Sequence, residues 1–512
     1  MKRRDFLKIS AGTAAATMAG VGTAASQAAL AASSLDKIEH VIVLMLENRS
    51  FDNLLGKLYP RSETFDGLTG EEFNLDASGQ RITVNNRVGT SADVMTTPNP
   101  NPGELWSDVN EQLFGRPEAP DADAVPDMSG FVRNYQRQTA RPAGRYDPQR
   151  IMHYFTPEQV PVLSLLARQF AVSDRWFASS PTQTWPNRFF VHTGTANGYE
   201  NNLPPRFPYR MPTIFERLHD RDPVNGWRIY YHDIPQSLTL TNLWKHRRHF
   251  SRFDKFLDQA RQGALPKYAF IEPDFFPVRG RQSDEHPPSS VAAGEALIAD
   301  VYNAVRQGPA WTKTLLIITF DEHGGCYDHV PPPLALPPSG AATTPFGFDR
   351  FGVRVPAVFV SPYIAAGQVL RPVGATPFDH TSIIATLRRR FDLGPPLTDR
   401  DAAAPSIEAV LNLPAPTNIG PERIDAPEGG LRGAAAVESA AAGEAGPITD
   451  LQQSLRELSD VLPAPGAEEA QIRRLEAAPA VAERRGLELR SASPAATGQT
   501  VDQNVRRFLG EN

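Results

Sequence analysis

The chain is predicted to fold as an α/β protein with a central, mostly parallel sheet. Residues 38–46 and 314–319 are nearly uninterrupted apolar runs, which is typical of strands buried on both faces. A segment with helical periodicity over 291–306 leads directly into the second run, which makes a helix-to-strand crossover. Polar clusters follow both runs, and α/β proteins place their chemistry at such strand ends.

The other elements follow in chain order. Residues 60–145 are rich in Pro, Asp, Gly and Asn and are interpreted as an insertion of loops and short elements over one edge of the sheet. A helix is expected to open at Thr156-Pro157, with apolar residues at helical spacing behind it. Residues 353–361 are predicted to form another strand, in which Pro356 indicates an irregularity or an edge.

The two ends of the chain differ in composition from its middle. Residues 1–31 contain a basic start with Arg3 and Arg4, a modestly apolar stretch and a small-residue cleavage site, as twin-arginine signal peptides do. The alternative is an Ala-rich helix of the mature fold. Residues 401–512 are interpreted as a linker, including 434–445, and a helical C-terminal extension with helices near 448–462 and 468–475.

Charge, hydropathy and cysteine content argue against a nucleic-acid-binding protein, a membrane-spanning protein and a disulfide-stabilised protein. The formal charge of the precursor is −6 and becomes about −9 without residues 1–31, which argues against nucleic-acid binding. Beyond the signal, no segment has the roughly 18 uninterrupted apolar residues of a membrane span, so the mature chain is expected to be soluble or peripheral. Cys326 is the only cysteine, and we interpret it as a space-filling residue, with a nucleophile or ligand as the alternative.

The polar clusters predict a metal-assisted site for phosphoryl transfer. Glu47 and Asn48 follow the first strand, and Asp321 and Glu322 follow the strand at 314–319. These four residues supply oxygen ligands, which favour Ca²⁺ or Mg²⁺ and also allow Mn²⁺. A single divalent cation is therefore expected where the strands end.

Four motifs in order resemble the bacterial phospholipase C and acid phosphatase family of phosphoesterases, in the alkaline-phosphatase-like superfamily. They cover residues 36–395 and read Glu47-Asn48-Arg49-Ser50-Phe51-Asp52, Thr184-Trp185-Pro186-Asn187-Arg188, Asp284-Glu285-His286-Pro287-Pro288, and Asp321-Glu322-His323-Gly324-Gly325 with Tyr327-Asp328-His329. The resemblance implies a three-layer α/β/α fold, with residues 36–400 as the catalytic domain.

The resemblance also implies roles for individual residues. Thr184 is expected to be the nucleophile that becomes a phospho-threonine, and to bind the metal together with Glu47, Asn48, Asp321 and Glu322. From its chemistry alone, Thr184 could equally be a turn residue that caps Asn187. The other expected site residues are the catalytic His286 and His323 and the substrate-binding Arg188, Glu104 and His380.

Several of these residues have alternatives. Arg188 could contact phosphate or anchor its loop by pairing with an acid, and His380 could be a structural group at a helix end. His286 is expected to hold phosphate or protonate the leaving group. Glu104 stands where family members often carry a histidine, which would weaken the binding of dianions or alter the pH optimum. Thr182-Gln183 also replaces the commoner Gly-Pro before the nucleophile.

The predicted function is phospholipase C-type hydrolysis in the periplasm or outside the cell. An acid phosphatase acting on monoesters is the alternative within enzymes, and a non-catalytic phosphoester-binding protein is the alternative outside them. The expected partners are a phospholipid or small phosphoester, the twin-arginine export machinery and, peripherally, a membrane. An aromatic rim for lipid could come from Trp106, Trp176, Trp185, Phe275 and Phe276.

Overall fold

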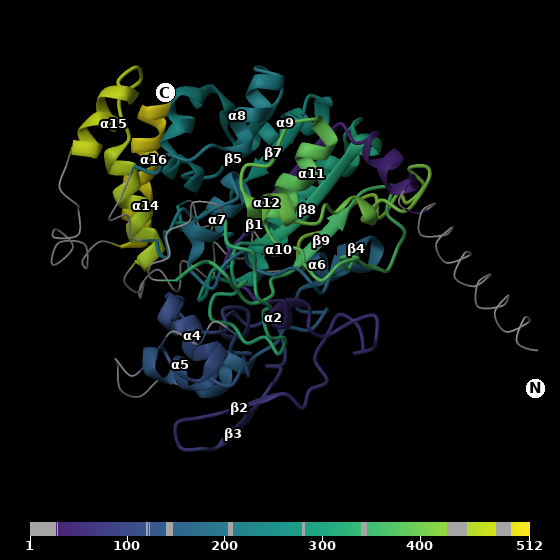
Figure 1. Cartoon of the computed structure of the whole chain (residues 1–512), viewed down its shortest axis with the longest axis vertical. Coiled ribbons are helices and arrows are strands. Elements are labelled where there is room, and N and C mark those ends of the chain that lie inside the picture. The colour runs from purple at the N-terminus through teal and green to yellow at the C-terminus, as the bar shows by residue number, and fades with distance from the viewer. Residues whose placement is uncertain are drawn as a thin grey trace, which may run out of the picture.

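The computed structural model describes most of the chain (Figure 1). The residues that it describes are 27, 29–118, 121, 123–139, 147–202, 208–278, 282–338, 346–427, 448–477 and 493–511. Most of the predicted signal and the predicted linker at 434–445 lie outside these ranges.

An eight-stranded mixed sheet forms the centre of the protein, in the order β10-β4-β9-β8-β1-β7-β5-β6. Strand β9 runs antiparallel to its neighbours β4 and β8, and the other pairings are parallel. The strands are β1 (His40–Leu46), β4 (Ala171–Ser173), β5 (Trp227–Tyr231), β6 (Phe250–Arg252), β7 (Tyr268–Ile271), β8 (Thr314–Phe320), β9 (Ala357–Val360) and β10 (Gln368–Val369).

The two predicted apolar runs are neighbours at the centre of this sheet. Strand β1 pairs with β8 so that Val43 lies opposite Ile317, and with β7 so that Val43 lies opposite Phe270. All seven residues of β8 are buried, as expected for a strand covered on both faces. The parallel pairing brings the carboxyl ends of β1, β7 and β8 to one edge of the sheet.

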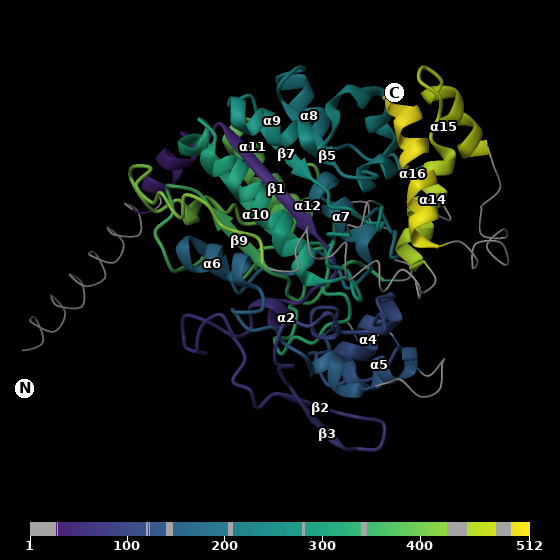
Figure 2. The ribbon, with the colours of Figure 1, turned by 180° about the vertical axis from the view of Figure 1, so that it is seen from behind.

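Helices cover both faces and complete the predicted three-layer α/β/α fold (Figures 1 and 2). One layer contains α6, α9 and α10, and the other contains α7, α8, α11 and α12. These helices are α6 (Pro161–Gln169), α7 (Thr184–Thr193), α8 (Ile214–Arg221), α9 (Phe253–Gln262), α10 (Val291–Gln307), α11 (Thr381–Phe391) and α12 (Asp399–Ala403). Short 3-10 helices connect them: η2 (Gln236–Thr239), η3 (Thr241–His249), η4 (Trp311–Lys313) and η5 (Glu408–Val410).

The predicted insertion folds as a separate lobe below one edge of the sheet (Figure 1). It has a small hydrophobic core of its own, which includes Val109, Leu113 and Phe131. Its elements are β2 (Phe73–Leu75), β3 (Arg81–Thr83), α3 (Ala92–Met95), α4 (Trp106–Phe114), α5 (Phe131–Thr139) and η1 (Pro148–Met152), and α2 (Phe51–Leu55) precedes it.

Three C-terminal helices pack together and dock on the main domain. They are α14 (Asp450–Val461), α15 (Glu468–Ala477) and α16 (Pro494–Leu509), of which α16 was not predicted. Gln452 Nε2 in α14 donates to the carbonyl oxygen of Phe275 at 2.8 Å, and Arg252 pairs with Asp502 of α16 at 2.6 Å.

Two of the predicted element boundaries were wrong. The helix expected to open at Thr156 begins at Pro161, because Gln159 Oε1 accepts from the Thr156 amide and closes a separate turn first. The strand expected at 353–361 is shorter and begins just after Pro356. Since β9 lies between β4 and β8, Pro356 marks the start of an interior strand and not an edge.

Candidate active site

The predicted metal ligands meet at the carboxyl ends of the central strands. Glu47 and Asn48 come directly after β1, and Asp321 and Glu322 come directly after β8. All four side chains are buried. Since β1 and β8 are parallel neighbours in register, the two polar pairs leave the sheet side by side.

Asn48 connects the two halves of this cluster. Its backbone N–H lies 3.2 Å from Asp321 Oδ1, and its Nδ2 donates to Glu322 Oε1 at 2.8 Å. The backbone has a φ of 60°, which asparagine tolerates better than most residues. The donation to Glu322 fixes the amide so that Oδ1 faces the third segment of the site. That segment carries Thr184.

Thr184 is the first residue of α7, and its hydroxyl donates to Asn48 Oδ1 at 3.4 Å. The partial positive charge at a helix N-terminus favours an anion there. The alternative, in which Thr184 caps Asn187, does not match the contacts. Asn187 instead braces the preceding loop, since its Oδ1 accepts from the Ser180 amide and its Nδ2 donates to the carbonyl oxygen of Thr182 at 2.9 Å.

Arg188 ties α7 to the carboxylates. Its Nε lies 3.1 Å from Asp321 Oδ2, and Nη2 lies 3.2 Å from Glu47 Oε1. Nη2 also donates to the carbonyl oxygen of Met45 at 3.2 Å. Arg188 therefore anchors its segment by pairing with acids, which is one of the two roles that the sequence allowed. Nη1 has no hydrogen-bond partner among the described residues, so a role in phosphate binding stays a prediction.

The carboxylate cluster fits a hard divalent cation. Burial and the charge of Asp321 raise the pKa of Glu47 well above its ordinary value. Burial and the charges of Glu104 and Asp321 do the same to the pKa of Glu322. Glu47 Oε2 is buried and lacks a hydrogen-bond partner in the described part of the chain. A cation would supply the missing positive charge, and the donors are all oxygens, which suit Ca²⁺, Mg²⁺ or Mn²⁺.

Glu104 and His286 form a buried pair beside the ligands. His286 Nε2 lies 3.4 Å from Glu104 Oε1, and the other ring nitrogen lies 2.7 Å from the carbonyl oxygen of Pro287. Burial alone would lower the pKa of His286, but the charge of Glu104 raises it well above the ordinary value. Burial alone would raise the pKa of Glu104, but the charge of His286 leaves it lower. The pair is therefore ionic.

His323 is held in a defined tautomer by the inserted lobe. Gln112 Nε2 donates to the carbonyl oxygen of Gly103 at 2.8 Å and to Asn134 Oδ1 at 3.0 Å, so its Oε1 must face His323. His323 Nε2 therefore donates to that oxygen at 2.7 Å, and Nδ1 faces Glu322 Oε2 at 3.2 Å. Burial lowers the pKa of His323 to about 3, which keeps the ring neutral.

His380 and Cys326 lie beneath the site. His380 Nε2 donates to the carbonyl oxygen of Asp321 at 2.6 Å, and Nδ1 accepts from the indole of Trp176 at 3.3 Å. Both ring nitrogens thus have protein partners. This agrees with the alternative in which His380 is a structural group at a helix end. Cys326 is fully buried, and burial raises the pKa of its thiol to about 12, as befits a space-filling residue.

The last residue of the first motif and the end of the fourth motif form a separate ionic cluster. Asp52, Asp328 and His329 place ligand atoms within 4.8 Å of one another. Arg354 already occupies this cluster, with Nη2 2.9 Å from Asp52 Oδ1 and Nε 3.0 Å from Asp328 Oδ1. We interpret it as a brace between the insertion and the sheet.

Three residues at the site were not predicted. Gln236 donates to Glu47, Glu272 faces Arg188 Nη1 at 3.9 Å, and the Asp284 carbonyl oxygen accepts from the Glu47 amide at 2.8 Å. Glu272 directly follows the apolar run of β7, so the logic applied to β1 and β8 could have found it. Asp284 is the first residue of the third motif, and burial raises its pKa to about 6.

The predicted aromatic rim was largely wrong. Trp176, Trp185, Phe275 and Phe276 are buried in the main core. Trp106 alone among the five is partly exposed, and its ring stacks on Phe346 with centroids 5.4 Å apart.

Comparison with known proteins identifies the family. The model of the phosphoesterase family matches residues 38–394, which is well over half of the chain. The chain belongs to the phosphoesterase family. As a phosphoesterase it is a hydrolase of phosphoric ester bonds, and the resemblance that the motifs predicted is confirmed.

Relatives from plants and bacteria match most of this phosphoesterase. Non-specific phospholipase C6 of Arabidopsis thaliana is 39% identical over 393 residues, which cover 73% of this chain and 72% of that protein. Non-specific phospholipase C3 of the same plant is 37% identical and covers 75% of each chain. Phospholipase C B of Mycobacterium tuberculosis is 28% identical over 491 residues, covering 83% of this chain and 88% of that protein.

The phosphoesterase is exported. A twin-arginine signal sequence matches residues 1–20, which directs the protein across the membrane to the periplasm or the exterior and confirms the predicted signal. Among the described residues, no helix is both long and apolar enough to cross a membrane.

Proposed function

We propose that this phosphoesterase is a metal-dependent phospholipase C that cleaves the phosphodiester of phospholipids through Thr184. The observation that carries the proposal is the position of the Thr184 hydroxyl. It lies at the N-terminus of α7 and is held against Asn48, within a cluster of buried oxygen donors. The names of the relatives, non-specific phospholipase C and phospholipase C B, support the substrate class.

Glu47, Asn48, Thr184, Asp321 and Glu322 would hold the divalent cation. When bound, this cation would supply positive charge that lowers the pKa of a coordinated hydroxyl and offsets charge on phosphate oxygens. Arg188 orients Asp321 and Glu47, and His380 fixes the backbone at Asp321. These contacts keep the carboxylates in place without using any group of the substrate.

In the first step, Thr184 Oγ1, after releasing its proton to solvent, would form a bond to phosphorus as the bond between phosphorus and the diacylglycerol oxygen breaks. The leaving oxygen would take its proton from the protonated His286, whose Nε2–H would turn from Glu104 to that oxygen. Water would then attack the phospho-threonine: its oxygen bonds to phosphorus, the bond from phosphorus to Thr184 Oγ1 breaks, and one water proton returns to His286 as the phosphorylated head group leaves.

The buried charge of Glu104 favours a diester over a monoester. A phosphodiester carries one negative charge near neutral pH, whereas a monoester carries nearly two. Glu104 adds a negative charge and neutralises His286, so a dianion is bound less well than a monoanion. Leu105, which is 45% exposed, and the partly exposed Trp106 follow Glu104 directly and offer an apolar contact for a lipid surface.

The test is hydrolysis of phosphatidylcholine vesicles beside p-nitrophenyl phosphate by the purified mature protein, with and without EDTA. We expect release of diacylglycerol that EDTA stops, and that Thr184→Ala removes while circular dichroism stays unchanged. Thr184→Ser is the matched control and should retain part of the activity. Wild-type rates in Thr184→Ala would refute Thr184 as nucleophile. Cleavage of the monoester alone would instead assign an acid phosphatase.

A further inference from the structure

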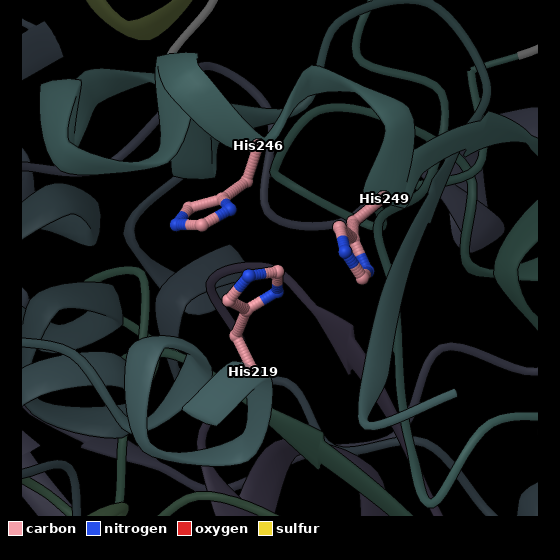
Figure 3. Close-up of side chains that lie close together, drawn as sticks. All are labelled: His219, His246 and His249. Atoms are coloured by element: carbon pink, nitrogen blue, oxygen red, sulfur yellow. The ribbon is translucent and has the colours of Figure 1, made fainter. Parts of the chain in front are cut away.

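Three histidines from two separate elements meet in one place (Figure 3). His219 lies in the last turn of α8, and His246 and His249 lie in η3. Each contributes a ring nitrogen, and these nitrogens all lie within 4.8 Å of one another. The ring centroid of His219 is 4.3 Å from that of His246 and 5.4 Å from that of His249. Figure 3 shows the rings pointing into a common space between the two elements.

The three histidines lie at the opposite end of the sheet from the active site. His249 immediately precedes β6, and its Nδ1 lies 2.8 Å from the carbonyl oxygen of Trp227, the first residue of β5. The cluster is therefore at the amino ends of these strands, whereas the active-site residues follow the carboxyl ends of β1 and β8. The five residues of β5 span roughly 17 Å, so the two places do not share side chains.

Two of the rings have nitrogens prepared to bind a cation. His249 Nδ1 carries the proton that is donated to Trp227, so the neutral ring has its lone pair on Nε2, and the carbonyl oxygen of Pro223 also lies within hydrogen-bonding reach of the ring. The indole of Trp227 also stacks on this ring at 4.3 Å and holds its orientation. His219 Nδ1 is buried and has no hydrogen-bond partner within the described part of the chain. A bound cation would give this buried nitrogen the partner that it lacks.

The charges around the cluster permit a cation. Among the basic neighbours, Arg228 donates to Ser251 Oγ and to the carbonyl oxygen of Arg248. Lys245 and Arg247 are paired with carboxylates. Lys245 lies 3.4 Å from Glu216 Oε1, and Arg247 pairs with Glu468 of α15.

We propose that His219, His246 and His249 bind one transition-metal cation of the Zn²⁺ class. Imidazole nitrogens suit Zn²⁺, Cu²⁺ or Ni²⁺, whereas the oxygen donors of the active site suit Mg²⁺ or Ca²⁺. Three protein ligands leave a fourth tetrahedral position for water. The cation links α8 to the segment that enters β6, so its role is to stabilise this edge of the domain. It takes no part in ester hydrolysis.

The test is a Zn²⁺ titration of the mature protein without an affinity tag, in excess Mg²⁺ to occupy the oxygen site. Bound zinc is measured by mass spectrometry after gel filtration. We expect His246→Ala to bind one equivalent less than wild type and to lose the rise in melting temperature that Zn²⁺ gives. Phosphoesterase activity in Mg²⁺ should stay at the wild-type level. His40→Gln, which removes a histidine elsewhere, should bind zinc like wild type.

A second variant keeps the test decisive if His246→Ala does not fold. His219→Gln changes a half-buried residue at a helix end, and it should also lose the zinc equivalent. Replacement of Zn²⁺ by Co²⁺ should give visible absorption bands in wild type that both variants lack. Equal zinc binding by wild type and a folded variant would overturn the site and leave three rings that only pack against one another.

Discussion

Thr184 Oγ1 lies 3.4 Å from Asn48 Oδ1, although 136 residues separate the two in the chain. Asn48 lies just beyond β1, and Thr184 begins α7, so the contact exists only when the helix is docked over the sheet. The amide of Asn48 is oriented by Glu322, which follows the neighbouring strand. Three chain segments thus determine the direction in which one hydroxyl points.

Glu104→Gln should shift the enzyme toward monoesters. The change removes a buried negative charge and frees His286 to face phosphate, so a dianion gains more than a monoanion. We expect the ratio of kcat/KM for p-nitrophenyl phosphate to that for a phosphodiester to rise roughly tenfold. Glu118→Gln, at an exposed position of the same lobe, should leave the ratio unchanged. A constant ratio in both variants would exclude Glu104 from substrate selection.

Asp321→Asn combined with Glu322→Gln should release the divalent cation. The substitutions remove two negative charges from the buried oxygen cluster, while the hydrogen-bonding shape is nearly kept. Metal content measured after gel filtration should fall to background, and turnover should be lost with it. Glu295→Gln is the control, because this buried carboxylate caps α6 through the amides of Val162 and Leu163 and does not contact the cluster. Unchanged metal content in the double variant would contradict the ligand assignment.

Gly324→Ala should destabilise the protein and impair the site. A Cβ at this position would lie 2.1 Å from the carbonyl oxygen of Asn48, and the backbone φ of 62° is strained for alanine. We expect a loss of about 2 kcal/mol or more in the free energy of unfolding, together with reduced turnover. Gly79→Ala isolates the backbone strain, since its φ is 85° but nothing lies within 4 Å of the added Cβ. Equal losses in urea denaturation would show that the contact with Asn48 is unimportant.

Stability should fall between neutral and alkaline pH because of His329. Burial alone would lower its pKa, but the charge and hydrogen bond of Asp52, together with Asp66, raise it to about 10. A raised pKa of a base stabilises the fold below the unfolded pKa, near 6.5, and this stability disappears as the pH rises through 10. The loss from pH 7 to 10 should be on the order of 3 kcal/mol.

Thermal or urea unfolding across this pH range measures the effect. His329→Gln should be less stable than wild type at pH 7 and should show a flatter dependence on pH. His40→Gln should follow the wild-type curve, because His40 contacts the carbonyl oxygen of Pro266 and no carboxylate of this cluster. Parallel curves for wild type and His329→Gln would assign the alkaline loss to other groups.

Local patterns predicted the parts of the molecule that depend on neighbours in sequence. The apolar runs of β1 and β8 correctly indicated strands that are buried on both faces. Helical periodicity predicted α10 almost to the residue. Boundaries were less accurate at Thr156, where a side-chain hydrogen bond closes a separate turn, and at Pro356, which has no amide hydrogen for the sheet and directly precedes β9. The helix α16 was missed although its signals are local, since Ser493 caps it before Pro494 and its buried residues Val501, Val505 and Phe508 have helical spacing.

By itself, the sequence determined the fold class, the export signal, the family and the oxygen-rich character of the site. Each depends on residue types in a fixed order. Only the tertiary structure decided which atoms meet: Arg188 with Asp321 and Glu47, Glu104 with His286, and both ring nitrogens of His380 with the protein. It also buried four of the five candidate rim aromatics and assembled His219, His246 and His249. The reason is physical: periodicity reports how much of a side chain is buried, whereas its partners depend on the order of strands and the docking of helices from distant parts of the chain.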